Sequence, residues 1–450
     1  MDIKKNDDIQ LNIENMTSEG AAVGHCNGIA VFVRGGVPGD EIIVHIIKTS
    51  KRYCIGIIKE IIKPSSSRIQ SSCTVSEKCG GCSFRNMTYA EELKYKKSRV
   101  EDAVKRIAHL DVPVKDVIKA EATARYRNKA QYPVYIENGK LNAGFYAYKS
   151  HRIVPCGDCE LQPEEFSSCI KAFGFWAEKA GVTSYDEKTG SGLLRHIYLR
   201  KAAGTGEIMA CAVINGTAIP ERGLLINELC KIDGIKSICV NVNLENSNVI
   251  LGEKTVTVWG SETITDILLG KRFEISPNSF YQVNHDQCEK LYSVAAEYAA
   301  LTGGETVVDL YCGAGTIGLT LAEKANRIFG IEIVPQAIEN ARRNAALNGI
   351  ENAEYFLGDA FDGARELEKR GVIPEVIILD PPRKGCQREL LETVTKMQPQ
   401  RIVYVSCDSA TLARDLEILD SLGYKAKEIT PVDMFPRTPH VEAVALITQS

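Results

Sequence analysis

Apolar residues along this chain come in short runs that predict strands more often than long helices. In the last third, apolar runs at 307–311, 327–332 and 377–379 are separated by helix-like stretches, which is typical of a parallel sheet covered by helices. Two more runs near the C-terminus, at 428–430 and 441–447, predict a final antiparallel hairpin. The pattern therefore favours an α/β fold for this part of the chain.

The first third of the chain has a different pattern. The runs 28–33 and 41–47 are rich in β-forming residues and are separated by Gly-Gly and Pro-Gly-Asp turns, which predicts a small OB-like β-barrel. A serine-rich linker at 63–68 ends it. A helix near 88–110 is expected to pack on the C-terminal domain. We expect three regions, namely the barrel 1–64, a central β-rich region 65–265 and an α/β domain 266–450.

Composition narrows the class of protein. The 450 residues carry a net charge of −4, with 44% hydrophobic and 25% charged residues, and no apolar run approaches the ~20 residues that cross a bilayer. The N-terminus has no apolar signal segment, so a cytoplasmic location without membrane attachment is expected. Fifteen cysteines then indicate reduced thiols, metal ligands and catalysis rather than a disulfide framework.

Clustered cysteines predict a metal site in the central region. Cys73, Cys79 and Cys82 are separated by five and two residues, and Cys156 and Cys159 follow later. Short glycine-containing loops let two sulfurs face one metal. The pairs at 79/82 and 156/159 would make a four-thiolate zinc site, whereas the first three cysteines with one later cysteine would hold a 4Fe-4S cluster.

Cations next to aromatic residues indicate contact with nucleic acid. The segments 125–129 and 195–200 alternate cations with aromatics, so bases could stack while the cations hold phosphates. A half-exposed strand with a solvated polar face is the alternative for each segment. The predicted barrel adds Lys48, Lys51, Arg52, Tyr53 and Lys59, and residues 1–130 hold 22 Lys and Arg against 16 Asp and Glu.

A glycine-rich turn predicts a nucleoside-containing cofactor. Gly313, Gly315 and Gly318 follow the apolar run 307–311, and Glu332 ends the next run. Glycines admit a ligand close to the backbone, and the acid on the next strand accepts hydrogen bonds from ribose. The same spacing fits a dinucleotide or S-adenosylmethionine. The segment beginning at Asp380 and the C-terminal hairpin favour a class I S-adenosylmethionine-dependent, Rossmann-like domain.

Two side chains at adjacent strand ends predict an active-site edge. Asp380 ends the run 377–379, and Cys407 follows the next strand. Because a helix begins directly after Cys407, with Asp408 as its N-cap, we expect the helix dipole to lower the pKa of this thiol. A small buried residue that fills space is the alternative.

These residues resemble those of the RNA uracil-5-methyltransferases over nearly the whole chain. The barrel is similar to the TRAM domain of that family, and Cys73, Cys79, Cys82 and Cys159 are similar to the ligands of its 4Fe-4S cluster, with Cys156 as an extra thiol that leaves zinc open. Five segments resemble the successive signature motifs of the family, namely 279–284, 309–313, 380–385, 406–408 and 440–442.

The resemblance implies a role for each matching residue. Cys407 would be the nucleophile that adds to carbon 6 of uracil, and Glu442 the base that removes a proton from carbon 5. The S-adenosylmethionine site would be lined by Gln282, Tyr311, Glu332, Asp359 and Asp380.

The resemblance also implies the substrate, which would be RNA and most directly 23S rRNA before full ribosome assembly, bound by a monomer. The alternatives are transfer RNA, or an exocyclic amine of a base, for which no thiol would be needed.

Overall fold

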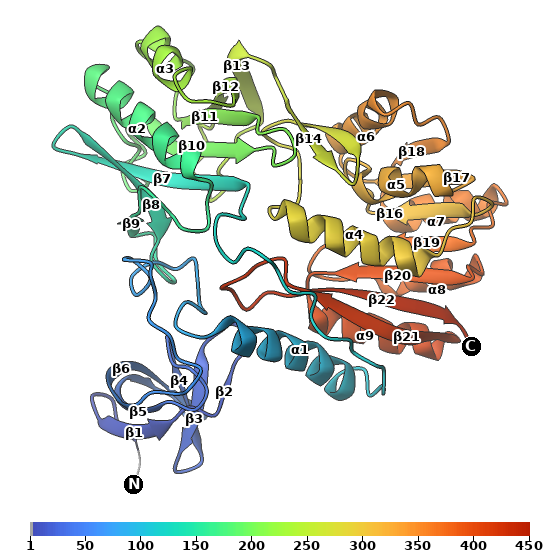
Figure 1. Ribbon diagram of the computed structural model, residues 1–450, viewed down its shortest axis with the longest axis horizontal. Coiled ribbons are helices and arrows are strands. Elements are labelled where there is room, and N and C mark those ends of the chain that lie inside the picture. Colours follow the sequence, from blue (N-terminus) through green and yellow to red (C-terminus); the bar gives the residue numbers. More distant parts are fainter. Residues whose placement is uncertain (1–2) are drawn as a thin grey trace.

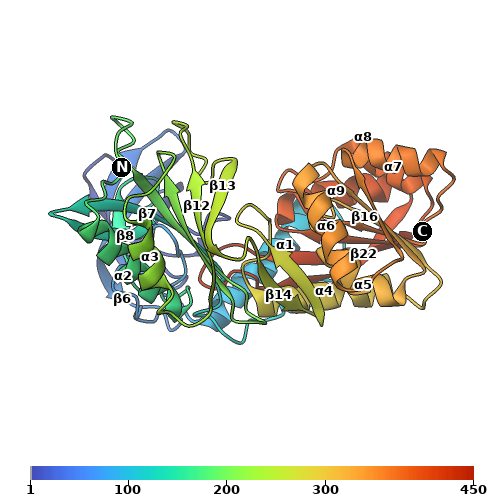
Figure 2. The same cartoon turned by 90° about the horizontal axis from the view of Figure 1, so that it is seen from above.

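The computed structural model describes residues 3–450 and contains three large β-sheets that follow one another along the sequence (Figure 1). Seen from above, the C-terminal sheet and its helices form one lobe, and the two preceding sheets lie together in the other lobe (Figure 2). Within residues 3–450, no helix is both long enough and apolar enough to span a membrane.

The N-terminal sheet has six strands in the order β1-β5-β6-β4-β3-β2. Side chains of β5 alternate, so that Ile42, Val44 and Ile46 are buried in its core. The edge strand β1 also lies against β3, so the sheet curls, and the predicted strands at 28–33 and 41–47 are confirmed. The strands are β1 (Asp8–Asn12), β2 (Asn15–Met16), β3 (Ala22–Cys26), β4 (Ile29–Val33), β5 (Glu41–Thr49) and β6 (Tyr53–Lys63).

The middle sheet has seven strands in the order β13-β12-β11-β10-β7-β8-β9. The helices α2 (Glu164–Lys179) and α3 (Arg222–Leu229) pack against each other and against this sheet. Its strands are β7 (Lys129–Glu137), β8 (Lys140–Tyr146), β9 (Ile153–Pro155), β10 (Leu194–Lys201), β11 (Ile208–Ile214), β12 (Ile235–Val242) and β13 (Lys254–Gly260).

The interpretation of 195–200 as an RNA-binding surface is wrong. This segment lies in β10, between β7 and β11, and all of its residues are buried. Arg200 donates to the carbonyl oxygens of Ser276 (3.1 Å) and Ser279 (2.8 Å). Arg195 likewise donates to the carbonyls of Asn243 and Glu245. Both cations are therefore internal braces, because their side chains are buried and donate to carbonyl groups of the protein itself.

The C-terminal sheet has seven strands in the order β18-β17-β16-β19-β20-β22-β21. The first five are parallel and β22 is antiparallel to β20, so the predicted parallel sheet and final hairpin are confirmed. The strands are β16 (Thr306–Leu310), β17 (Arg327–Glu332), β18 (Ala353–Leu357), β19 (Val376–Leu379), β20 (Arg401–Ser406), β21 (Tyr424–Val432) and β22 (Glu442–Gln449).

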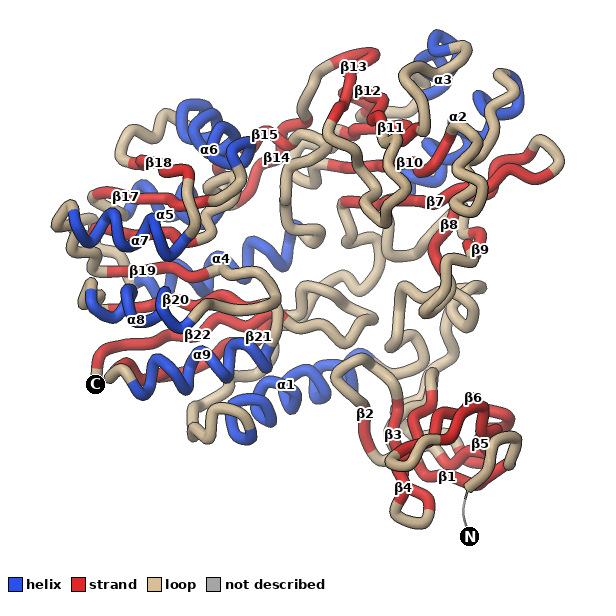
Figure 3. The backbone as a smooth tube through the Cα atoms, turned by 180° about the vertical axis from the view of Figure 1, so that it is seen from behind, coloured by secondary structure: helices blue, strands red, loops and turns tan. Residues whose placement is uncertain are grey.

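Helices cover both faces of this sheet (Figure 3). One face carries α4 (His285–Ala299), α5 (Thr316–Leu321), which runs on into the short 3-10 helix at Ala322–Lys324, and α6 (Pro335–Leu347). The opposite face carries α7 (Ala360–Lys369), α8 (Arg388–Lys396) and α9 (Ser409–Ser421). The sheet is thus buried on both sides, as its continuous apolar strands require.

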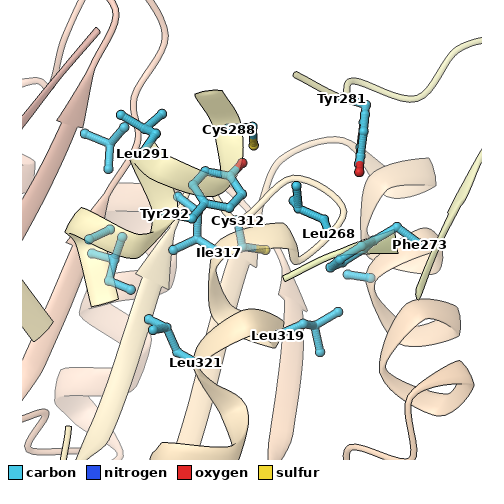
Figure 4. Close-up of a cluster of buried hydrophobic side chains, with 14 of the residues drawn as sticks. Leu268, Phe273, Tyr281, Cys288, Leu291, Tyr292, Cys312, Ile317, Leu319 and Leu321 are labelled. Carbon is cyan, nitrogen blue, oxygen red and sulfur yellow. The ribbon is translucent and has the colours of Figure 1, made fainter. Parts of the chain in front are cut away.

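A two-stranded hairpin, β14 (Ile264–Leu268) and β15 (Lys271–Ile275), joins the middle sheet to the C-terminal domain. Leu268 and Phe273 of this hairpin belong to the same buried cluster as Leu319 of α5 (Figure 4). The expected boundary at residue 265 therefore falls inside β14, in a segment that packs on the C-terminal core.

The helix α1 (Tyr89–Arg106) precedes the middle sheet in sequence and packs on the C-terminal domain, as its pattern predicts. It lies against α9 and β21, and its Val100 and Val104 are buried in the core on that face of the sheet. The segment after it continues along β21, where Val114 pairs with Ile429 and Ile118 pairs with Val432.

Candidate active site

Three side chains meet at the carboxyl edge of the parallel strands. Asp380 follows β19, Cys407 follows β20, and Glu442 begins the antiparallel β22. Ser406 of β20 pairs with Ala443 of β22, so the register places Cys407 beside Glu442. Asp380 lies near enough to act on the pKa values of both. The three groups expected at this edge therefore lie together, with a thiol near two carboxyl groups.

Burial raises the pKa values of these carboxyl groups to near neutral pH. Burial, then the charge of Asp380, raises the pKa of Glu442 to about 8, and burial raises the pKa of Asp380 to about 7. Asp309 at the end of β16 has its pKa raised to about 8 by burial and by Asp380, although it accepts a hydrogen bond from the Gly318 amide at 3.0 Å. Sequence reasoning missed Asp309 as a titrating group.

The expectation of a lowered Cys407 pKa is wrong for the protein alone. Burial, followed by the charges of Glu442 and Asp380, raises the pKa of this thiol to about 11, and Arg383 opposes the rise. The predicted N-cap is present, since Asp408 accepts from the amides of Ala410 (2.9 Å) and Thr411 (3.1 Å). Because Asp408 accepts from these amides, the helix end contributes less to Cys407 than the sequence suggests.

The glycine turn leaves open space at the backbone. Gly313 and Gly315 have φ of 56° and 78°, and a Cβ added at Gly313 would meet no atom within 4 Å. Glu332 spans this turn, accepting from the Gly313 amide at 3.1 Å and from the Val334 amide at 2.9 Å. Tyr311, also at positive φ (67°), is half-buried beside the turn, where burial raises its pKa. The backbone is therefore open at Gly313, beside the Glu332 carboxylate, whereas a Cβ at Gly315 would meet the Tyr355 hydroxyl at 2.7 Å.

Two exposed apolar side chains next to Glu332 were not singled out from the sequence. Ile333 is 61% exposed and Leu357 is 56% exposed, and the β17–β18 register pairs Leu357 with Glu332. Their position after strand ends is the signal that could have found them, since apolar residues there have no core to enter. Asp359 is exposed and caps α7 by accepting from the Phe361 amide at 2.9 Å.

Gln282 lies in a segment that the middle region holds in place. Its carbonyl accepts from the Asn128 amide side chain at 2.9 Å, and the Asn128 backbone amide donates to Val283 at 2.8 Å. Phe280, two residues earlier, is 71% exposed. The segment before the helix α4 is therefore fixed by Asn128, which directly precedes β7, and by Arg200 of β10, while the Phe280 ring remains exposed.

Five cysteines from distant parts of the sequence line one cavity of about 260 Å³. The cations Arg85, Arg127 and Lys129 line it as well, and Arg85 pairs with Glu160 at 2.5 Å. The neighbouring Cys156 thiol lowers the pKa of Cys159, and Cys156 Sγ lies 3.6 Å from the Asp158 carbonyl. The cysteines are Cys73, Cys79, Cys82, Cys156 and Cys159.

The thiols surround the cavity without forming a site for a single ion. Within residues 3–450, no group of three or more His, Cys, Asp or Glu side chains is placed to hold a metal ion. The two predicted cysteine groups do come together, and the extra Cys156 lies with them rather than elsewhere. Which four of the five bind a metal stays a prediction.

Comparison with known proteins gives a consistent result. The sequence profile described as tRNA (Uracil-5-)-methyltransferase matches residues 261–450. A protein of Clostridium tetani described as "Uncharacterized RNA methyltransferase" is 44% identical over 99% of this chain and 97% of its own length. One of Halalkalibacterium halodurans, with the same description, is 44% identical over 99% and 98%.

A solved structure is similar over its full length. The tRNA (uracil-54, C5)-methyltransferase of Pyrococcus abyssi, solved in complex with S-adenosyl-L-homocysteine, is 30% identical to this chain with a TM-score of 0.80. The likeness covers 98% of this chain and 99% of that one, so all three sheets are shared rather than the C-terminal domain alone.

Proposed function

This chain belongs to the RNA uracil-5-methyltransferase family, and we propose that it methylates carbon 5 of a uridine in RNA through a covalent bond to Cys407. The observation that carries the proposal is the placement of Cys407 beside Glu442 at the sheet edge that also holds the glycine turn. Neither an exocyclic amine as acceptor nor simple RNA binding would need a thiol there.

The thiol answers a problem of reactivity. Carbon 5 of uracil is a weak nucleophile, so Cys407 first adds to carbon 6 and makes the ring electron-rich, which divides one difficult step into easier ones. Cys407 must lose its proton before it adds, and Asp380, with a pKa of about 7, is an acceptor in its surroundings, so that Glu442 stays available for the later proton.

The carboxylate of Glu442 completes the reaction. After methylation, carbon 5 carries both the methyl group and its original hydrogen, and that proton must leave before the thiolate can be expelled. A buried carboxyl with a pKa of about 8 suits this role, because a base works best when its pKa lies near the working pH. Glu442 accepts the proton, the ring double bond re-forms, and the carbon–sulfur bond to Cys407 breaks.

The chain has residues that fit S-adenosylmethionine, which supplies the methyl group when bound. The open backbone at Gly313 admits the ligand, and Glu332 lies where ribose hydroxyls would be held. Ile333 and Leu357 present apolar surface that suits the adenine ring. Tyr311, Gln282, Asp359 and Asp380 complete the proposed site.

We propose that the cysteine cavity holds a 4Fe-4S cluster, with a four-thiolate zinc site as the alternative. A cluster fills the space between four thiolates, and the cations of Arg85, Arg127 and Lys129 face its negative charge. We assign Cys73, Cys79, Cys82 and Cys159 as ligands. The cluster would be structural or would position RNA, since methyl transfer moves no electrons.

The proposed substrate is 23S rRNA before full ribosome assembly, acted on by a monomer. A base paired in a helix cannot reach a partly buried thiol, so the target uridine must be flipped out or unpaired. The exposed Lys48, Lys51 and Arg52 of the N-terminal sheet would hold backbone phosphates. Mapping 5-methyluridine in RNA from cells that lack this protein separates ribosomal from transfer RNA, since only the true substrate loses the modification.

A covalent trap tests the mechanism. RNA that contains 5-fluorouridine accepts the thiol and the methyl group, but fluorine cannot leave as a proton, so the protein stays attached. With S-adenosylmethionine present, we expect a stable protein–RNA adduct, which should be absent for Cys407→Ala. Cys230→Ala, at an exposed cysteine away from the site, is the matched control. An adduct that persists in Cys407→Ala would disprove the assignment.

A further inference from the structure

The loop between β21 and β22, residues 433–441, leads directly into Glu442. Val432, the last residue of β21, pairs with Glu442 across the hairpin, so the loop connects two residues that face each other. In Figure 1 this red loop reaches out from the sheet toward the start of α1. The contacts of the loop therefore decide where the carboxyl group of Glu442 lies.

A buried charge network joins this loop to α1. The Lys96 ammonium contacts Asp433 Oδ1 at 2.6 Å and Glu92 Oε1 at 2.7 Å, and all three side chains are fully buried. The Tyr89 hydroxyl donates to the other oxygen of Asp433 at 2.7 Å. Such groups are costly to bury without partners, so the network is stable only when loop and helix meet in this arrangement.

Other contacts fix the rest of the loop. The Arg437 amide donates to Glu92 Oε1 at 2.7 Å, and the Arg99 guanidinium donates to the Pro439 carbonyl at 2.7 Å. The Lys96 ammonium also reaches the Phe435 carbonyl at 3.2 Å. The loop is therefore held by α1 at its first residue, at Arg437 and three residues before Glu442, while Gln287, Asn284 and Tyr126 donate to the carbonyls of Asp433, Met434 and Pro436.

We propose that Lys96, Glu92 and Arg99 of α1 are positioning residues that place Glu442 to take the proton from carbon 5. This inference rests on the proposed function. Packing alone would not need charges here, because apolar residues of similar volume often stabilise a fold as well as a buried ion pair does. A buried network of paired charges instead selects one geometry, and a base needs one geometry because a shift of about 1 Å costs about 100-fold in rate.

Two RNA substrates separate positioning of the base from general stability. Adduct formation with 5-fluorouridine RNA needs the Cys407 thiolate but no removal of a proton from carbon 5, whereas turnover of ordinary RNA needs both. We expect Lys96→Met to form the trapped adduct at a near-normal rate. Its kcat on ordinary RNA should fall about 100-fold with KM little changed, and methylated RNA should accumulate on the protein.

Controls keep the result decisive. Lys97→Met, at the neighbouring position where the side chain pairs with Asp116 at the surface, should behave like the unaltered protein. Arg99→Met removes only the contact to Pro439 from a partly exposed side chain, so it covers the case in which Lys96→Met does not fold. It should show the same separation to a smaller extent.

The inference and the proposed function fail in different ways. Equal losses on both RNAs in a folded variant, or no loss on either, would overturn the positioning role while the adduct in the unaltered protein still supports the mechanism. If the unaltered protein forms no adduct, the proposed function itself fails.

Discussion

At the scale of single residues, burial decides ionisation at the site. Asp309, Asp380 and Glu442 have pKa values raised to about 8, 7 and 8, and burial is the first cause each time. In an unfolded chain these groups ionise near pH 4. The folded protein thus keeps protons that the unfolded chain releases as the pH rises from about 4 to 8, and the contribution of these groups to stability falls over that range.

The effect of pH on stability tests these assignments. Glu442→Gln removes one such carboxyl, so its unfolding temperature should fall less than that of the unaltered protein between pH 5.5 and 8.5, by about 3 °C. Glu428→Gln, which removes a carboxylate that pairs with Lys115 at the surface, is the control. Parallel curves for Glu442→Gln and the unaltered protein would show that Glu442 ionises normally.

At the scale of elements, the same residue pattern has opposite meanings in two sheets. Alternating cations and aromatics lie inside the middle sheet on β10, whereas Lys51 and Arg52 lie between β5 and β6 and are exposed. The sequence patterns are similar because both segments are rich in β-forming residues. Position within the sheet makes the difference, since β10 has a neighbour on each side and helices over its face.

The substitution Arg200→Met tests whether this side chain stabilises the fold or binds RNA. Loss of its bonds to the Ser276 and Ser279 carbonyls should cost about 2 kcal/mol of unfolding free energy, measured by urea denaturation. The salt dependence of RNA binding should not change. Arg52→Met should do the reverse, with normal stability and a slope of log K against log salt reduced by about 0.9. A reduced slope in Arg200→Met would restore the RNA-binding interpretation.

At the scale of the whole molecule, residues before the C-terminal domain hold the loop that leads to the proposed base Glu442. The loop before Glu442 is clasped by α1, and the amides of Ser83 and Phe84, just after Cys82, donate to the Arg437 carbonyl at 3.0 and 3.1 Å. The cysteine cavity and the catalytic edge are therefore linked by a few residues of chain. This linkage gives the proposed cluster a structural purpose.

Metal content tests the cavity. The purified protein should be brown and contain about four irons per chain, and Cys79→Ser should lose both colour and iron. Cys156→Ser should keep them if Cys159 is the fourth ligand, and Cys230→Ser, outside the cavity, is the control. A colourless protein with about one zinc per chain would mean that the cavity is a four-thiolate zinc site.

The sequence alone determined the order of the elements and the chemistry at their ends. Apolar runs bounded by Asp380, Cys407 and the glycine turn place these residues at one edge, because parallel strands of one sheet share a carboxyl end. That reasoning needs only local pattern. The resemblance to the family motifs then indicated the roles of Cys407 and Glu442. The pattern of apolar and polar residues alone does not indicate them.

Only the tertiary structure decided how those residues behave. The Cys407 pKa is raised by burial and then by the charges of Glu442 and Asp380, which come from other strands, and the Lys96 network joins residues that are 337 positions apart. The five cysteines likewise meet around one cavity from two separate segments. A sequence pattern indicates which side chains are buried, but the charges that they are buried with depend on long-range packing, and in a dry interior those charges decide ionisation and position.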